Sequence, residues 1–205
     1  MTDTQKKPLW KNELVWLFLI TSGLFAILYS KFILGGYAYV FTDTGADTMQ
    51  INYAQYGLFS SLFRSGESGY VLQAGLGMDV SSYYPAYLIP YNLLILLAPQ
   101  RLLPWAVLAS AYLKMITISL VGYLFYRKLM QDGIGTMAAA LAWTFSGYVI
   151  LWGQHYGFCT CMALFTVFMY FLQCYLNGEK RWKSAGLVLT VTMLLISSYY
   201  FLYMI

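Results

Sequence analysis

Residues Leu102 to Phe125 read LLPWAVLASAYLKMITISLVGYLF, an apolar run whose single charge is Lys114. A helix needs about 20 mostly apolar residues to cross a bilayer, so this run predicts a membrane-spanning helix. Comparable runs predict four more spans, near residues 14–34, 134–152, 158–176 and 185–205. We therefore expect an all-α, polytopic helical membrane protein with about five transmembrane helices.

The composition agrees with lipid as the solvent of this chain. Of its 205 residues, 60% are hydrophobic, 19% are aromatic and 10% are charged, whereas ordinary soluble domains are about 25% charged. The net charge of +4 is small and forms no basic stripe, so nucleic acid is not an expected partner. The run at 14–34 exceeds a signal-peptide core of about 7–15 residues, and we interpret it as a retained span.

The positions of lysine and arginine predict the orientation of the spans, because cytoplasmic loops carry an excess of cations. With five spans, one group of cations shares a side with the N-terminus: Lys6, Lys7, Lys11, Arg127, Lys128, Lys180, Arg181 and Lys183. The opposite side keeps Arg64 and Arg101, with Lys31 near the boundary. We therefore place the N-terminus in the cytoplasm and residues 35–101 in a long extracellular loop of a cell-membrane protein.

Two apolar pieces lie within this outer loop. From Met49 to Phe63, apolar residues recur at helical spacings and predict an amphipathic helix in the membrane interface. Its predicted apolar face consists of Ile51, Leu58, Phe59, Leu62 and Phe63. The piece from Leu88 to Ala98 contains Pro90 and is too short to cross, so it predicts a re-entrant or interfacial segment.

The first candidate site is a pair of aspartates, Asp43 and Asp47, at the outer end of the first span. In a chain with eight acidic residues, two carboxylates four apart would share a face if the segment is helical. Like charges raise one pKa and can create a general base, and the pair could equally hold a divalent cation. Alternatively, Asp47 caps the interfacial helix, with Thr44 as a competing cap.

Three other residues are candidates for chemistry. Lys114 is costly in mid-span and should face a protein or water-filled interior, either as a structural cation or as a binding group for a lipid-linked phosphate. His155, the single histidine, lies in an outer turn, and Asp79 lies in a glycine-rich loop. Cys159 and Cys161 point to different helix faces, so we interpret them as small buried hydrophobes rather than metal ligands.

Several short motifs follow one another in a specific order. After a basic tail and one span come Phe41-Thr-Asp-Thr-Gly-Ala-Asp47, Gln55-Tyr56, Tyr84-Pro85, Pro90-Tyr-Asn-Leu-Leu94 and the span with Lys114. In this order the chain resembles the YfhO family of bacterial membrane proteins, which is similar to glycosyltransferases of the GT-C class. Members often carry a proline soon after the Gln-Tyr pair, whereas Gly57 follows it here. The chain stops inside an apolar run, so we expect it to be the N-terminal portion of such a protein.

The resemblance implies a GT-C-like fold and an enzyme that moves a sugar from a polyprenyl-phosphate carrier to an extracellular cell-envelope polymer. In Gram-positive bacteria that acceptor would be lipoteichoic or teichoic acid. The loop aspartate of the family corresponds to Asp43 or Asp47, which would act as the base in an inverting transfer. The candidate substrate-binding residues are Gln55, Tyr56, Asp79, Tyr84, Lys114 and His155.

Two other functions fit the same residues. A transporter or flippase subunit would use the intramembrane lysine and the outer acids as a substrate path. A scaffold for envelope assembly would tolerate the loss of both aspartates, whereas an enzyme would not.

Overall fold

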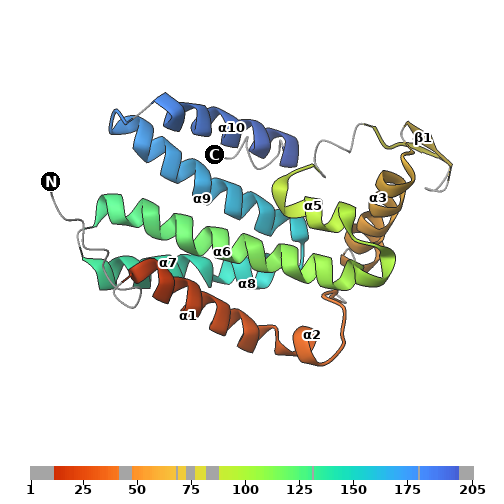
Figure 1. Ribbon diagram of the computed structural model, residues 1–205, viewed down its shortest axis with the longest axis horizontal. Coiled ribbons are helices and arrows are strands. Elements are labelled where there is room, and N and C mark those ends of the chain that lie inside the picture. Colours follow the sequence, from red (N-terminus) through yellow and green to blue (C-terminus); the bar gives the residue numbers. More distant parts are fainter. Residues whose placement is uncertain are drawn as a thin grey trace, which may run out of the picture.

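The computed structural model describes residues 12–41, 48–67, 69–72, 77–81, 88–130, 132–179 and 181–198. These residues are mostly helical, as the apolar runs predict (Figure 1). Three helical stretches are long and apolar enough to cross a membrane: Gln100–Leu129, Gly133–Trp152 and Tyr156–Leu176. Two further apolar helices, Glu13–Leu28 and Trp182–Ser197, are shorter.

The helices form a bundle around α6 (Leu103–Leu129), the most buried of the three long ones. Helices α1, α7 and α9 pack against α6, and α10 packs against α9. Consecutive long helices run in opposite directions, so that chain segments enter and leave at the same two ends of the bundle (Figure 1). The bounds are α1 Glu13–Leu28, α7 Gly133–Thr144, α8 Gly147–Trp152, α9 Tyr156–Leu176 and α10 Arg181–Ser197.

The first predicted span, 14–34, is interrupted. It forms α1 and the short helix α2 (Ser30–Leu34), which meet at Tyr29. No proline or glycine marks this junction, and Tyr29 is instead buried and stacked on Phe25, with ring centroids 4.4 Å apart. The helix therefore bends where an aromatic ring packs into the bundle, which hydrophobic periodicity alone does not reveal.

The predicted span 134–152 is also interrupted, at Phe145 and Ser146 between α7 and α8. The hydroxyl of Thr144 donates to the carbonyl oxygen of Ala140 at 2.7 Å. The same kind of bond is made by Thr160 and Thr166 inside the unbroken helix α9, so it does not by itself end a helix. Ser146 then adopts extended dihedral angles, φ −61° and ψ 154°, which ends one helix before the next begins.

Residues of the predicted outer loop form a second layer over the N-terminal half of α6 (Figure 1). Its helical elements are a π-helical turn, Thr48–Tyr53, then α3 (Ala54–Ser65), α5 (Pro90–Leu97) and a 3-10 turn, Gln100–Leu102. Helix α5 packs against both α3 and α6. It is too short to span a bilayer, as predicted, and it begins with Pro90, whose missing N–H is not needed at that position.

The face that α3 buries differs from the predicted one. Its buried residues are Tyr56, Phe59, Ser60 and Leu62, whereas Ile51 and Phe63 are exposed. The hydroxyl of Ser60 donates to the carbonyl oxygen of Ala98 at 2.7 Å, so this polar residue is satisfied inside the protein. The predicted face contained apolar residues alone, whereas the face that α5 covers includes Ser60.

Replacing Ser60 with alanine is expected to lower the free energy of unfolding by about 1–3 kcal/mol, because the buried carbonyl of Ala98 loses its donor. The measurement is thermal unfolding in detergent. The exposed neighbour Ser61 provides the control, and Ser61→Ala should leave the melting temperature unchanged. Equal melting temperatures for the two variants would contradict the role of this bond.

A small hairpin adds strands to the all-α architecture. Strands β1 (Tyr70–Val71) and β2 (Met78–Asp79) pair antiparallel, with Tyr70 opposite Asp79. Gly69 and Gly77 flank them at positive φ, which glycine adopts without strain. The glycine pattern predicted loops here, and two-residue strands are too short to show an alternating pattern.

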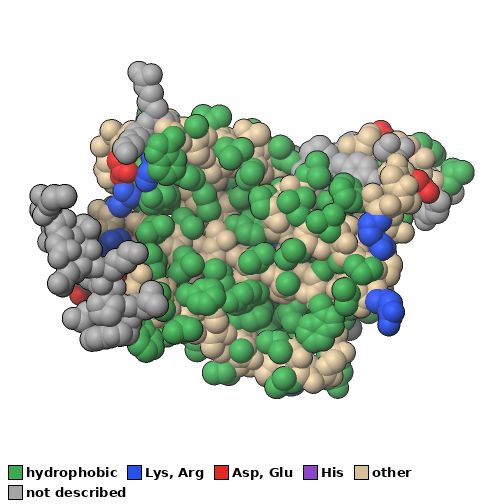
Figure 2. Space-filling model, in the orientation of Figure 1, with side chains coloured by type: hydrophobic (Ala, Val, Ile, Leu, Met, Phe, Trp, Pro, Cys, Tyr) green, Lys and Arg blue, Asp and Glu red, His purple; other side chains and the backbone are tan. Residues whose placement is uncertain are grey.

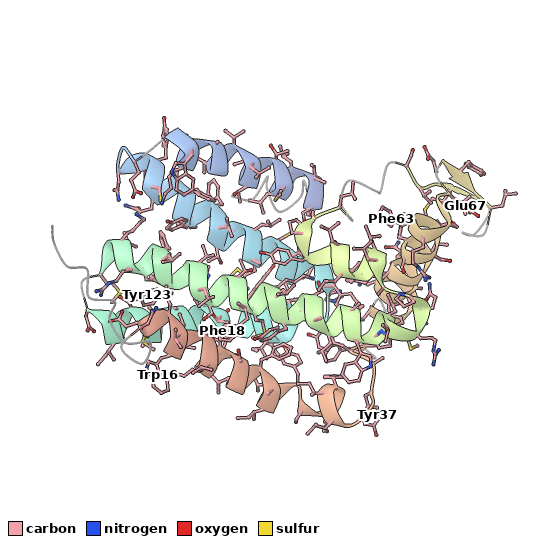
Figure 3. The ribbon with its side chains drawn as sticks, in the orientation of Figure 1. Trp16, Phe18, Tyr37, Phe63, Glu67 and Tyr123 are labelled. Atoms are coloured by element: carbon pink, nitrogen blue, oxygen red, sulfur yellow. The ribbon has the colours of Figure 1, made fainter. Side chains whose placement is uncertain are left out.

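Charged side chains lie at the two ends of the bundle, with a wide hydrophobic surface between them (Figure 2). At one end, the side chains of Lys128 and Lys183 bind the carboxylate of Glu179. Arg64 and Arg101 lie in the elements at the other end. Figure 3 labels one residue near each of these two ends, Tyr123 and Tyr37.

Acid is expected to loosen the end of the bundle that contains Glu179. Hydrogen bonding from Lys128 is the largest influence on this carboxyl and lowers its pKa. Burial raises the pKa and hydrogen bonding from Lys183 lowers it, and the net effect is a lowered pKa. Because its pKa is lower in the folded protein, the ionised carboxylate contributes stability at pH values above its unfolded-state pKa of about 4.3. This contribution is lost as the pH falls through the folded-state pKa. Glu179→Gln should therefore flatten the dependence of melting temperature on pH below about pH 5. Parallel curves for wild type and variant would contradict the assignment.

Candidate functional site

Lys114 is the centre of the candidate site. It lies about 16 Å from the start of α6, at 1.5 Å per residue, and 2% of it is exposed. Its Nζ donates to the backbone carbonyl oxygen of Tyr156 at 3.1 Å. An ammonium group has three donors, yet within the described residues this is its one hydrogen bond, and no carboxylate there lies within ion-pair distance. Such a buried cation can bind a further anionic or polar group.

The first turn of α9 lies beside Lys114. His155 is the N-cap residue, with φ −84° and ψ 94°, and its side chain makes no capping bond. The N-terminal end of a helix carries partial positive charge, so the helix dipole does not neutralise the lysine, although its Nζ bonds the carbonyl oxygen of Tyr156 in this turn. A cation and a helix N-terminus together favour an anion.

Tyrosines from two other segments pack against Tyr156 in this turn. The phenol of Tyr156 donates to the backbone carbonyl of Tyr39. Its ring stacks on Tyr56, with centroids 5.4 Å apart and planes at 11°. The phenol of Tyr56 in turn donates to Oδ1 of Asn92 at 3.4 Å. These contacts join α3, α5 and the segment after α2 to α9, so that three elements of the outer layer meet at the candidate site.

Ser110 extends the polar face of α6. It lies four residues before Lys114 and therefore on the same helix face. Ser110 is buried, and its hydroxyl has no hydrogen-bond partner in the part of the chain that the structure describes. Most buried hydroxyls are paired, so the same stripe of α6 offers two buried polar groups with unused capacity.

The predicted catalytic residues Asp43 and Asp47, and the binding candidate Tyr84, lie outside the described residues. The described residues on either side of the aspartates are nevertheless held near α9. Thr48 donates from Oγ1 to the carbonyl oxygen of Gln154 at 3.1 Å. On the other side, Phe41 packs edge-on against Tyr39, with centroids 5.1 Å apart.

The remaining predicted residues fall in different places. His155 precedes the residue whose carbonyl binds Lys114. Its ring forms a three-ring cluster with Trp152 and Phe158, at centroid distances of 5.6 and 5.2 Å. Gln55 is half-buried beside Tyr56 on the helical segment that enters the site. The structure thus brings Tyr56, Lys114 and the residue after His155 together.

Asp79 is separate from this cluster. It belongs to strand β2, and the hairpin lies at the far end of the molecule while Lys114 lies midway along α6 (Figure 1). Its carboxylate accepts hydrogen bonds from the hydroxyl of Ser81, at 2.7 Å, and from the same residue's backbone, at 3.0 Å. These bonds lower its pKa. The geometry assigns Asp79 to stabilising the loop after the hairpin.

No group of three His, Cys, Asp or Glu residues gathers as a metal site within the described ranges. Cys159, Cys161 and Cys174 are buried free thiols. The divalent cation considered for Asp43 and Asp47 concerns residues outside the described ranges.

Near the site, burial raises the pKa of Tyr39, so its phenol stays protonated and donates to the carbonyl of Gly153 at 3.4 Å.

Sequence reasoning missed Tyr39, Asn92, Ser110 and Tyr156. The chain contains 20 tyrosines, so no single one stands out by type. The spacing of Ser110 and Lys114 was a usable signal, because polar residues four apart share one face of an apolar helix. The contacts of Tyr39 and Asn92 depend on how the outer layer folds back onto α9, which local sequence does not encode.

The fold and the site define a mostly helical protein with helices that could cross a membrane and a buried cation at mid-bundle. No protein-family model matches the chain, and no curated protein or solved structure matches it either.

Proposed function

We propose that this protein is a membrane glycosyltransferase of the GT-C type. It moves a sugar from a polyprenyl-phosphate carrier to a cell-envelope polymer such as lipoteichoic or teichoic acid. The observation that carries the proposal is Lys114, which is buried, has one hydrogen bond for its three donors and lies beside the N-terminal turn of α9.

The proposed topology has five spans and a cytoplasmic N-terminus. The alternating helix directions support it (Figure 1), with α1 joined to α2 as the first span and α10 as the fifth. Lys128 and Lys183 lie together at one end of the bundle, which we assign to the cytoplasm. The YfhO resemblance is consistent with this arrangement and with an outer layer between the first two spans.

The proposed reaction is a single inverting displacement. The carboxylate of Asp43 or Asp47 takes the proton of the acceptor hydroxyl. The hydroxyl oxygen forms a bond to the anomeric carbon, and the bond between that carbon and the carrier phosphate breaks. The electron pair leaves with the phosphate, whose charge Lys114 and the first turn of α9 stabilise. Atoms and charge balance without a redox partner.

The experiment that tests this function compares envelope sugars in three strains. A deletion strain should lose one sugar substituent from its wall or lipoteichoic acid, and the wild-type gene should restore it. An unchanged glycan profile in the deletion strain would contradict the proposal.

One observation favours a transporter or flippase subunit as the second candidate. Helices α1 and α2 together form one broken helix, and α7 and α8 form another. Broken helices form substrate sites in many transporters. A transporter would move the lipid-linked sugar in vesicles without attaching it to an acceptor, so measuring lipid translocation separately from sugar transfer distinguishes the two.

A further inference from the structure

A second candidate site, lined mainly by apolar residues, lies on the other side of α6. Two adjoining pockets, of about 180 and 450 Å³, share Phe32, Tyr37 and Ala38. We call them together the α2 groove. Trp105 and Leu108 of α6 form one wall of the smaller pocket, and Lys31 lines the larger. The groove lies where α2 ends, at the end of the bundle that Tyr37 marks in Figure 3.

The α2 groove faces away from Lys114. Leu108 and Lys114 are six residues apart, which separates them by about 120° around α6 and about 9 Å along it. Aromatic rings stand between the two sites: Tyr39 packs edge-on against Phe32, at 5.1 Å, and stacks on Tyr156, at 5.9 Å. An occupant of the groove is therefore distinct from a ligand of Lys114.

The groove has the character of an interfacial lipid site. Tyr37 is 68% exposed and Trp105 is 50% exposed, and such aromatic residues anchor proteins at the membrane surface. Lys31 is exposed, and no carboxylate in the described part of the chain pairs with it. An apolar groove lined by one exposed cation is complementary to a hydrocarbon chain below an anionic head group.

The backbone turns at the edge of the groove. Gly35 ends α2 and its N–H donates to the carbonyl oxygen of Lys31 at 3.0 Å, and Gly36 has φ +68°. Both glycines line the groove. We propose that the α2 groove binds one acyl chain of an anionic glycerophospholipid, with its phosphate beside Lys31. This inference does not depend on the proposed enzyme activity.

The test uses Trp105 as a reporter in lipid nanodiscs that contain the intact protein. Brominated phosphatidylglycerol or brominated phosphatidylcholine is added as a minor lipid, and the Trp105 signal is isolated by subtracting the fluorescence of Trp105→Phe. Phosphatidylglycerol should quench Trp105 at about a five-fold lower mole fraction, because one interfacial cation favours an anionic lipid by about that factor.

Three variants show whether the selectivity comes from Lys31. Lys31→Gln should abolish the preference and Lys31→Arg should keep it. Arg101→Gln, which removes an exposed cation outside the groove lining, should keep it too. Equal quenching by both lipids in the wild type, or equal losses in Lys31→Gln and Arg101→Gln, would overturn the proposal. Displacement of the brominated phosphatidylglycerol by an equimolar polyprenyl phosphate would also overturn it, because the groove would then belong to the sugar carrier.

Discussion

Replacing Lys114 with methionine is expected to lower sugar transfer by about 10²- to 10³-fold, the usual cost of removing one preorganised group that stabilises developing charge. Methionine keeps an unbranched side chain in a helix position that is 2% exposed, so packing changes little. The amine is lost together with its hydrogen bond to the carbonyl of Tyr156. The measurement is the amount of envelope sugar in the complemented deletion strain, normalised to protein in the membrane.

The hydroxyl of Thr160 provides a matched control for this prediction. It donates to the same carbonyl oxygen of Tyr156, at 3.0 Å, as Lys114 does. Thr160→Val therefore removes a structural bond at the same atom but leaves the cation in place, and it should keep transfer within a few-fold of wild type. Equal losses in Thr160→Val and Lys114→Met would mean that the lysine serves only to hold α9 against α6.

The second large effect is expected from the aspartates. Asp43→Asn or Asp47→Asn should lower transfer by about 10²- to 10⁴-fold, the range for loss of a general base. The larger loss identifies the base, because asparagine keeps the shape of aspartate but cannot accept the proton. A smaller loss in the other variant is expected if that residue caps the helical segment that begins at Thr48.

Asp79→Asn is the matched control for the aspartate variants. This exposed carboxylate is bound to Ser81 in the hairpin region, and its replacement should not alter transfer. If Asp43→Asn and Asp47→Asn both left the envelope sugar unchanged at normal membrane levels, the enzyme proposal would fail and the scaffold would be favoured.

The sequence predicted the helices well but not their interruptions. Long apolar runs gave α6 and α9 nearly to their ends, because membrane helices follow length and hydropathy. The interruptions at Tyr29 and Ser146 were not predicted, because neither the packing of Tyr29 on Phe25 nor the extended dihedral angles of Ser146 appear in the hydrophobic periodicity. Likewise, the apolar spacing around α3 did not predict that Ser60 would be buried, where its hydroxyl donates to the carbonyl oxygen of Ala98.

The candidate site was predicted in part. Lys114 stood out because a charge in an apolar run is rare and costly, and the structure places it in the bundle centre. Its partner is a backbone carbonyl, which every residue possesses, so the sequence could not name Tyr156. Asp79 looked equivalent to other loop acids but belongs to a hairpin with its own hydrogen bonds. These bonds fix its carboxylate in the local turn, and its role in substrate binding stays a prediction.

The central claim is that Lys114 binds the phosphate of a polyprenyl-linked sugar, and its most direct test is the affinity of the intact protein for a polyprenyl phosphate in nanodiscs. Lys114→Met should weaken this affinity by about 10- to 100-fold, which corresponds to one hydrogen bond between charged groups. Thr160→Val should bind as wild type does. Identical dissociation constants for wild type and Lys114→Met would contradict the claim.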